Sequence, residues 1–252
     1  MDVSSKHIQW KPFLFFHAAA ACLLASWLFQ PTRELWNALD AVVFRFLNSS
    51  LEGSPFWQIF WAIANVRITD LFGAIFMSSF FILYIMDGKK GSGERTERLA
   101  QFLYVCAWGE LGILFTKEPL NDFLKMIHFA RESPSLLFPH TIMLSDAVPW
   151  LKVKDFARGC FPGDHAEILL QWTAFVWFFC DKRYAIYATV WTTFFMMPRL
   201  VAGAHWASDA FVGSLSIVCV IMAWACYSPL YGYGMELLTK FINLFRRHEH
   251  VQ

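Results

Sequence analysis

Long runs of apolar residues, separated by short polar stretches, form the main pattern along this chain. A helix needs about 20 apolar residues to cross the hydrocarbon core of a bilayer. Runs close to that length lie at residues 12–29, 69–86, 99–115, 166–180, 184–203 and 209–230. The pattern predicts an all-α integral membrane fold, a bundle of six transmembrane helices.

The composition supports this class. Of the 252 residues, 57% are hydrophobic and only 16% are charged, which is poor in charge for a soluble domain of this length. The net charge is +1, so no strong basic field points to a nucleic-acid partner. Without an internal repeat or a low-complexity linker, we expect one membrane domain covering residues 1–252.

The basic residues between the apolar runs indicate how the helices are oriented. Under the positive-inside rule, cytoplasmic segments carry the excess of lysine and arginine. The relevant residues are Lys6, Lys11, Lys89, Lys90, Arg95, Arg98, Lys182, Arg183, Lys240, Arg246 and Arg247. Both termini are therefore expected in the cytoplasm, and residues 30–54 and 116–165 on the opposite side, which is the periplasm in a cell with two membranes.

Two segments outside the six runs are expected at the outer membrane surface. Residues 55–64 contain Trp57 and Trp61, which are typical of the membrane interface, so this stretch is read as interfacial. Residues 116–162 form a long connection with many apolar side chains, which favours a packed cap of loops and short helices over disorder.

The cysteines and histidines do not predict a disulfide framework or a metal site. Five of the six cysteines fall within or at the ends of predicted helices, and no two stand at metal-ligand spacing. No nucleotide-binding loop is readable either. We expect a protein that works without a metal, a nucleotide or another cofactor.

The first candidate site is the run Phe161–His165, which precedes an apolar helix. The start of a helix offers free backbone N–H groups and the positive end of the helix dipole to an anion such as phosphate. Gly163 and Asp164 would lie at this anion site, where glycine lets the backbone approach closely. His165 could then protonate a leaving-group oxygen as a general acid.

The second candidate site combines Arg199, His205 and Asp209. His205 and Asp209 are four residues apart, so on a helix beginning near His205 the carboxylate could accept a hydrogen bond from imidazole Nδ1. Nε2 would then be free to attack phosphorus. Arg199, at the end of the preceding helix, could hold the phosphoryl oxygens.

These motifs resemble those of the type 2 phosphatidic acid phosphatases and vanadium haloperoxidases. The family pattern Pro-Ser-Gly-His corresponds to Pro162–His165, and the pattern Ser-Arg-(five)-His-(three)-Asp is matched with Pro198 in place of serine. The resemblance implies a six-helix bundle with His205 as nucleophile, Asp209 as its orienting partner and His165 as the acid.

The family's first motif, Lys-(six)-Arg-Pro, has a less regular counterpart. Lys125 precedes Arg131 with five residues between them, and the proline is displaced to Pro134. By resemblance, Arg131 and Lys125 are expected as phosphate ligands. The departure in spacing affects the assignment of Lys125, so Arg131 is the safer of the two.

More narrowly, three stretches resemble the lipid A 1-diphosphate synthases: residues 65–70, the run Phe161–His165, and Pro198–Arg199 with residues 203–206. The resemblance implies a bacterial inner-membrane enzyme with its active site on the periplasmic side. Such an enzyme moves a phosphate from undecaprenyl diphosphate to the 1-phosphate of lipid A through a phosphohistidine intermediate.

Several alternatives stay open on the sequence alone. Arg67 and Asp70 could pair with each other at the membrane boundary or bind substrate, and Arg158 is either a solvated charge or a ligand for a second phosphate. With water as the acceptor the enzyme would be a lipid-phosphate phosphatase. Charges within the helices also fit a small lipid transporter, and vanadate-dependent oxidation is a remote analogy.

Overall fold

The computed structural model describes residues 6–90 and 93–249, with side chains up to residue 245. Every regular element in these ranges is a helix. In chain order the elements are α1 (Trp10–Leu28), α2 (Gln30–Ser49), α3 (Pro55–Ala64), α4 (Arg67–Met86), α5 (Glu94–Phe115), η1 (Thr116–Leu120), α6 (Asn121–Met126), α7 (Pro134–Leu137), α8 (Leu144–Ala147), α9 (Asp164–Phe179), α10 (Lys182–Val201), η2 (Asp209–Ser214), α11 (Leu215–Tyr227) and α12 (Pro229–Glu249).

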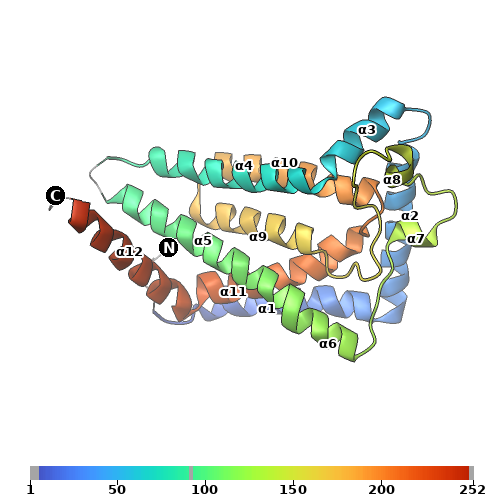
Figure 1. Ribbon diagram of the computed structural model, residues 1–252. Coiled ribbons are helices and arrows are strands. Elements are labelled where there is room, and N and C mark those ends of the chain that lie inside the picture. Colours follow the sequence, from blue (N-terminus) through green and yellow to red (C-terminus); the bar gives the residue numbers. More distant parts are fainter. Residues whose placement is uncertain (1–5, 91–92, 250–252) are drawn as a thin grey trace.

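The long helices α1, α4, α5, α9, α10 and α11 run along a common axis (Figure 1). Helix α9 packs against α5, α10 and α11, while α1 packs against α11. The interior around α9 is rich in aromatic rings, with Trp172 and Phe175 buried among Phe80, Phe81 and Tyr104. Burial of such large apolar side chains holds the bundle together.

Four helical segments are long and apolar enough to cross a membrane: Trp10–Leu28, Arg67–Met86, Glu94–Met126 and Asp209–Tyr227. Their outer surfaces carry exposed apolar side chains, such as Leu71, Phe72 and Ile75 on α4, which suit contact with lipid. The chain is therefore a multi-pass membrane protein. Helices α9 and α10 form where the sequence predicts two further spans, but α9 has 16 residues and α10 begins with Lys182 and Arg183.

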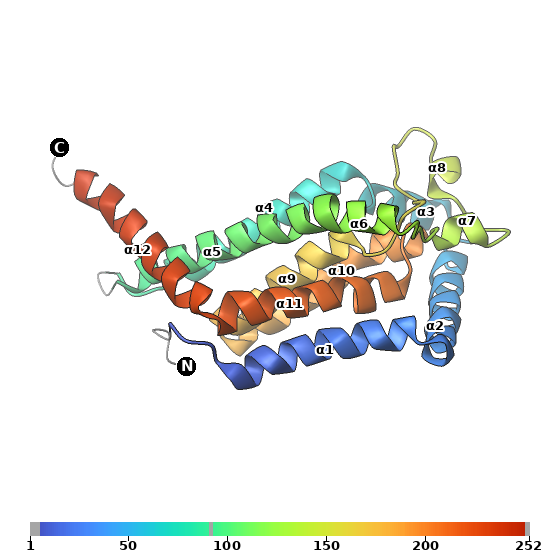
Figure 2. The same ribbon diagram turned by 90° about the horizontal axis from the view of Figure 1, so that it is seen from below.

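Helix α2 is not predicted by the sequence pattern, because residues 30–49 do not form a continuous apolar run. It crosses the end of the bundle at a steep angle (Figures 1 and 2). Its inward face buries Asp40, Phe44 and Asn48, at intervals of four residues, whereas its outward face exposes apolar residues including Leu39 and Phe46. Asp40 and Asn48 thus place polar groups on the buried face of α2, whereas its exposed face mixes apolar side chains with Glu34 and Arg45.

The segment after the third predicted helix continues α5. Residues 116–126 extend it through η1 and α6, with Pro119 inside the π-helical turn, so the helix runs well past the predicted end at residue 115. Two short helices, α7 and α8, follow, and α8 packs against α3. Helix α3 spans the residues expected at the interface, Pro55–Ala64.

The last predicted helix, at 209–230, is interrupted. Ser228 has an extended backbone and Pro229 follows it, so the chain turns and α12 leaves the bundle obliquely (Figure 2). Glu236 on α12 binds Lys6 and Lys240 at 2.5 and 2.6 Å. The hydrogen bonds from these two lysines lower the pKa of Glu236 to about 2, and the bond from Lys240 has the larger effect. Both chain ends lie at the end of the bundle opposite α2.

Candidate active site

The two predicted motifs meet in one pocket near the end of the bundle that α2 crosses. Helix α9 begins there, α10 ends there, and η2 starts there. The residues that line the pocket are Gly163, His165, Ala166, Met196, Arg199, Leu200, His205, Asp209 and Ala210. The free space is about 10 Å³, room for about one water molecule.

His205 lies in the turn between α10 and η2 and points its two ring nitrogens in different directions. Nδ1 is 2.9 Å from the carbonyl oxygen of Cys160 and 3.4 Å from Asp209 Oδ2. The nearest acceptor for an Nδ1 proton is therefore a backbone carbonyl rather than the expected carboxylate. Nε2 is buried and has no hydrogen-bond partner among the described residues. With the proton on Nδ1, Nε2 presents its lone pair.

Asp209 is fully buried at the start of η2 and is held by several donors. Oδ2 accepts from the backbone N–H of Trp206 at 2.8 Å, and Oδ1 accepts from Arg131 Nη1 at 2.5 Å. Burial, and after it the charge of Asp209, raises the pKa of the Cys160 thiol, which therefore keeps its proton and donates to Asp209. The Asp209 carboxylate is fixed beside His205 from three sides.

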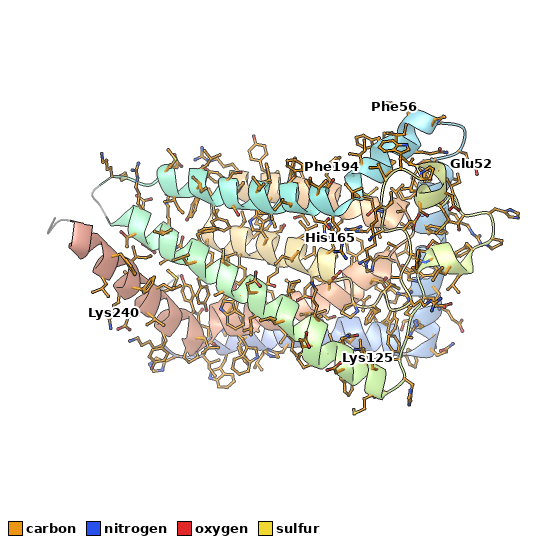
Figure 3. All side chains as sticks on the ribbon, in the orientation of Figure 1. Glu52, Phe56, Lys125, His165, Phe194 and Lys240 are labelled. Carbon is orange, nitrogen blue, oxygen red and sulfur yellow. The ribbon has the colours of Figure 1, made fainter. Side chains whose placement is uncertain are left out.

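The first-motif residues occupy different surroundings from those expected of phosphate ligands. Arg131 spans two carboxylates, with Nη1 on Asp209 and Nη2 on Asp40 at 2.7 Å. Lys125 lies on α6, is exposed, and pairs with Asp122 at 3.2 Å. Figure 3 shows it far from His165. The structure brings Arg131 to the site but leaves Lys125 outside it.

On the other side of the pocket, Asp70 connects Arg199 and His165. Arg199 Nη2 donates to Asp70 Oδ2 at 2.8 Å, and its Nη1 donates to the backbone and side-chain oxygens of Asn65 at 3.1 and 2.5 Å. His165 Nδ1 is 3.7 Å from Asp70 Oδ1, and its Nε2 donates to the Phe195 carbonyl at 3.0 Å. Asp70 is therefore not paired with Arg67.

Arg67 and Arg158 are exposed and do not line the pocket. Gly163 does, and its carbonyl accepts from Ser214 at 2.7 Å. Asp164 accepts from the backbone N–H of His165 at 2.8 Å, and its carboxylate also interacts electrostatically with Lys154, His205 and Lys117.

Sequence reasoning missed Asp40, Asn65, Cys160, Lys117 and Lys154 as neighbours of the site. A signal existed for Asp40, a carboxylate directly flanked by the apolar residues Leu39 and Ala41, and for Lys117, which comes shortly after the third apolar run. The backbone role of Cys160 leaves no signal in the sequence.

An aromatic stack holds the loop that leads into α9. The Phe161 ring lies 4.4 Å from that of Trp27, nearly parallel to it, and the Arg33 guanidinium carbon is 3.4 Å from the Trp27 ring centre. Burial and the neighbouring charge of Arg131 lower the pKa of Arg33. The stack ties α1 and α2 to the Phe161–His165 motif.

Gly203 gives the turn before His205 its shape, and we expect Gly203→Ala to destabilise the protein. Gly203 has φ +75°, and a Cβ atom there would lie 2.7 Å from the Phe44 ring and 3.0 Å from Ser135 Cβ. Backbone strain and overpacking together should lower the free energy of unfolding by about 2 to 4 kcal/mol, measured by thermal unfolding in detergent micelles.

The matched control is Gly53→Ala. Gly53 has φ +67°, but a Cβ atom added there would have no other atom within 4 Å among the described residues, so only the backbone term of about 1 kcal/mol applies. Equal destabilisation by the two substitutions would contradict the packing argument at Gly203.

The pocket is built from segments that recur in known proteins. Residues 102–231, slightly more than half of the chain, match the PAP2 superfamily. The chain belongs to the PAP2 superfamily. It is also similar to lipid A 1-diphosphate synthase of Escherichia coli (strain K12), with 28% identity over 209 residues, covering 82% of this chain and 84% of that protein. No solved structure matches the chain.

This PAP2 superfamily member is an enzyme of the lipid phosphatase or phosphotransferase class. The family match runs from α5 to the start of α12 and includes both motifs. Asp40, Asn65 and Asp70 lie before residue 102 and therefore outside it. The amino-terminal part of the chain thus contributes side chains next to the pocket, such as Asn65 and Asp70 on Arg199, that the family match does not cover.

Proposed function

We propose that this protein transfers a phosphate from undecaprenyl diphosphate to the 1-phosphate of lipid A through a phosphohistidine intermediate. The observation that carries the proposal is His205 Nε2, which is buried, has no partner among the described residues, and belongs to the pocket that Arg199 and His165 also line. The similarity to lipid A 1-diphosphate synthase supports the choice of lipids.

In the first step, His205 Nε2 attacks the terminal phosphorus of the donor. The bond between that phosphorus and the bridging oxygen breaks, and His165 supplies a proton to the departing lipid phosphate. Arg199 holds phosphoryl oxygens with the N–H groups that Asn65 and Asp70 do not occupy. In this proposal the phosphoryl group sits beside Gly163, which lines the pocket, and the start of α9, whose first residue is Asp164.

In the second step, an oxygen of the acceptor phosphate attacks phosphohistidine, and His165 takes up a proton if the acceptor carries one. The phosphorus–nitrogen bond breaks and returns a neutral His205. Two in-line displacements retain the configuration at phosphorus. Asp209, 3.4 Å from Nδ1, stabilises the cationic ring of the intermediate.

The same proposal includes the membrane arrangement. The six helices α1, α4, α5, α9, α10 and α11 cross the bacterial inner membrane within a single domain of residues 1–252. The pocket faces the periplasm beneath a cap formed by residues 127–162, after the extended α5, and both termini are cytoplasmic. In support of this arrangement, the chain ends and the pocket lie toward opposite ends of the bundle.

Hydrolysis is the second candidate function, because the PAP2 match supports a phosphatase as well as a phosphotransferase. If water replaces the acceptor lipid, the enzyme is an undecaprenyl diphosphate or other lipid-phosphate phosphatase. The residues that form and break phosphohistidine are the same in both reactions.

One experiment separates the two functions. The purified protein is incubated with undecaprenyl diphosphate labelled in the terminal phosphate, with and without lipid A. We expect the label to move onto lipid A. Label found only as free phosphate would make the enzyme a phosphatase, and label that stays on the donor would refute both functions for this lipid.

A further inference from the structure

Asp40 is a buried carboxylate next to the pocket that the proposed reaction does not use. It lies on the inward face of α2 with an exposed fraction of 1%. Oδ1 accepts from the backbone N–H of Ser208 at 2.8 Å, while Oδ2 accepts from Ser208 Oγ at 2.5 Å and from Arg131 Nη2 at 2.7 Å. A buried charge is costly unless it is paired and hydrogen-bonded, as Asp40 is here.

Arg131 joins Asp40 to Asp209. Nη1 donates to Asp209 Oδ1 at 2.5 Å and to Ser208 Oγ at 2.8 Å, while Nη2 donates to Asp40. Both ends of the planar guanidinium are therefore committed to carboxylates. Ser208 Oγ accepts from Arg131 and donates to Asp40, which closes the network.

We propose that Asp40 and Arg131 are positioning residues for His205: Asp40 holds Arg131, and Arg131 holds the Asp209 carboxylate beside the imidazole. The inference rests on the proposed phosphohistidine chemistry and assigns Arg131 a different role from the phosphate ligand expected by resemblance. It also gives α2 a part in the reaction.

The charges explain why a second carboxylate is needed. Arg131 alone would neutralise Asp209 and leave the ring of phosphohistidine, which is cationic, without a counter-charge. With Asp40 present, two carboxylates share one guanidinium, so the network keeps one net negative charge. That charge matches the cation that forms on the ring, at low cost in reorganisation because the network is already fixed.

Other charged groups face His205 from the remaining elements. Asp164 lies at the start of α9, Arg199 and His165 line the pocket from α10 and α9, and the Cys160 thiol contacts Asp209 from the loop. None of these residues is itself replaced in the Asp40 and Arg131 variants, so the variants change the charge of the network alone.

The test compares Asp40→Asn and Arg131→Met with Asp122→Asn, an exposed aspartate that pairs with Lys125 outside the pocket. Displacement of Asp209 should lower kcat about 10²-fold in the first two variants, with KM within about twofold of wild type. Asp122→Asn should match wild type. A raised KM with unchanged kcat in Arg131→Met would assign Arg131 to phosphate binding and overturn the proposal.

The pH profile gives the sharper readout, because the nucleophile must be unprotonated to attack. Asp40→Asn removes a negative charge and disfavours protonation of the imidazole, so the acidic limb of kcat/KM should move to lower pH. Arg131→Met removes a positive charge, so the same limb should move to higher pH. The absence of these opposite displacements would overturn the proposal.

Ser208→Ala keeps the test valid if the charge variants fail to fold. It removes the hydroxyl shared by Arg131 and Asp40 but leaves all three charges in place. We expect kcat about tenfold below wild type with an unmoved pH profile. Wild-type kcat in Ser208→Ala would count against a fixed network.

The ring ¹⁵N signals of His205 separate this proposal from the proposed function. If wild type and Asp122→Asn lack transfer and hydrolysis, the proposed function fails. A changed ring signal in Ser208→Ala or Asp40→Asn would still support the positioning role, and identical signals would overturn it. If wild type is active, wild-type kinetics in Asp40→Asn, Arg131→Met and Ser208→Ala would overturn the positioning role and leave the proposed function intact.

Discussion

Replacement of His205 by alanine is expected to reduce phosphoryl transfer by about 10⁶-fold, to the background level, because the attacking atom is lost. In the wild-type protein, brief incubation with labelled donor followed by an alkaline quench should trap acid-labile label on the protein, as phosphohistidine. His205→Ala should carry none. The contact of Nδ1 with the Cys160 carbonyl leaves Nε2 as the free ring nitrogen of His205.

His140→Asn provides the control, because His140 is exposed and its φ of 64° is one that asparagine tolerates. It should retain the activity and the labelled intermediate of wild type. Substantial turnover by correctly folded His205→Ala protein would rule out covalent catalysis by this residue.

Replacement of His165 by glutamine is expected to lower kcat on the lipid diphosphate by about 10²- to 10⁴-fold. Glutamine can still donate to the Phe195 carbonyl, as His165 Nε2 does, but it cannot protonate the leaving group. With phosphatidic acid, whose alkoxide leaving group is far more basic than a phosphate and needs the proton more, the loss should grow by about tenfold.

His17→Gln is the matched control, since His17 also contacts a backbone carbonyl, that of Phe13 at 2.8 Å, but lies on α1 outside the pocket lining. It should leave both activities unchanged. An equal loss on both substrates in His165→Gln would assign His165 to binding or folding rather than to proton transfer.

The helices were predictable where hydropathy alone determines them. All six apolar runs coincide with helices. The predicted helix ends differ most from the observed ones where a proline alters the backbone. Helix α5 continues through Pro119 because a π-helical turn accommodates the missing N–H, and the last run breaks at Ser228 because Pro229 starts a new helix. Helix α2 escaped prediction because polar residues occupy the face that the structure buries.

The candidate site was predictable to the extent that its residues are close in sequence. His165, Arg199, His205 and Asp209 line one pocket, and their catalytic roles stay predictions. Their partners could not be foreseen, since Asp40 meets Arg131 and Asn65 meets Arg199 across 91 and 134 positions of the chain. Spacing also suggested that Lys125 accompanies Arg131, but α6 directs it away from the pocket.

The buried polar side chains of α2 have a consequence for how this enzyme tolerates sequence change. In a water-soluble protein, moving polar residues outward and apolar residues inward stabilises a helix. Here, exchanging Asp40 or Asn48 for leucine would remove the partners of Arg131 and of the Val201 carbonyl. Polar substitutions at Leu39 or Phe46 would put polar groups on the outward face, which these apolar side chains now occupy. Redesign for solubility at α2 would therefore remove the contacts that connect this helix to the pocket.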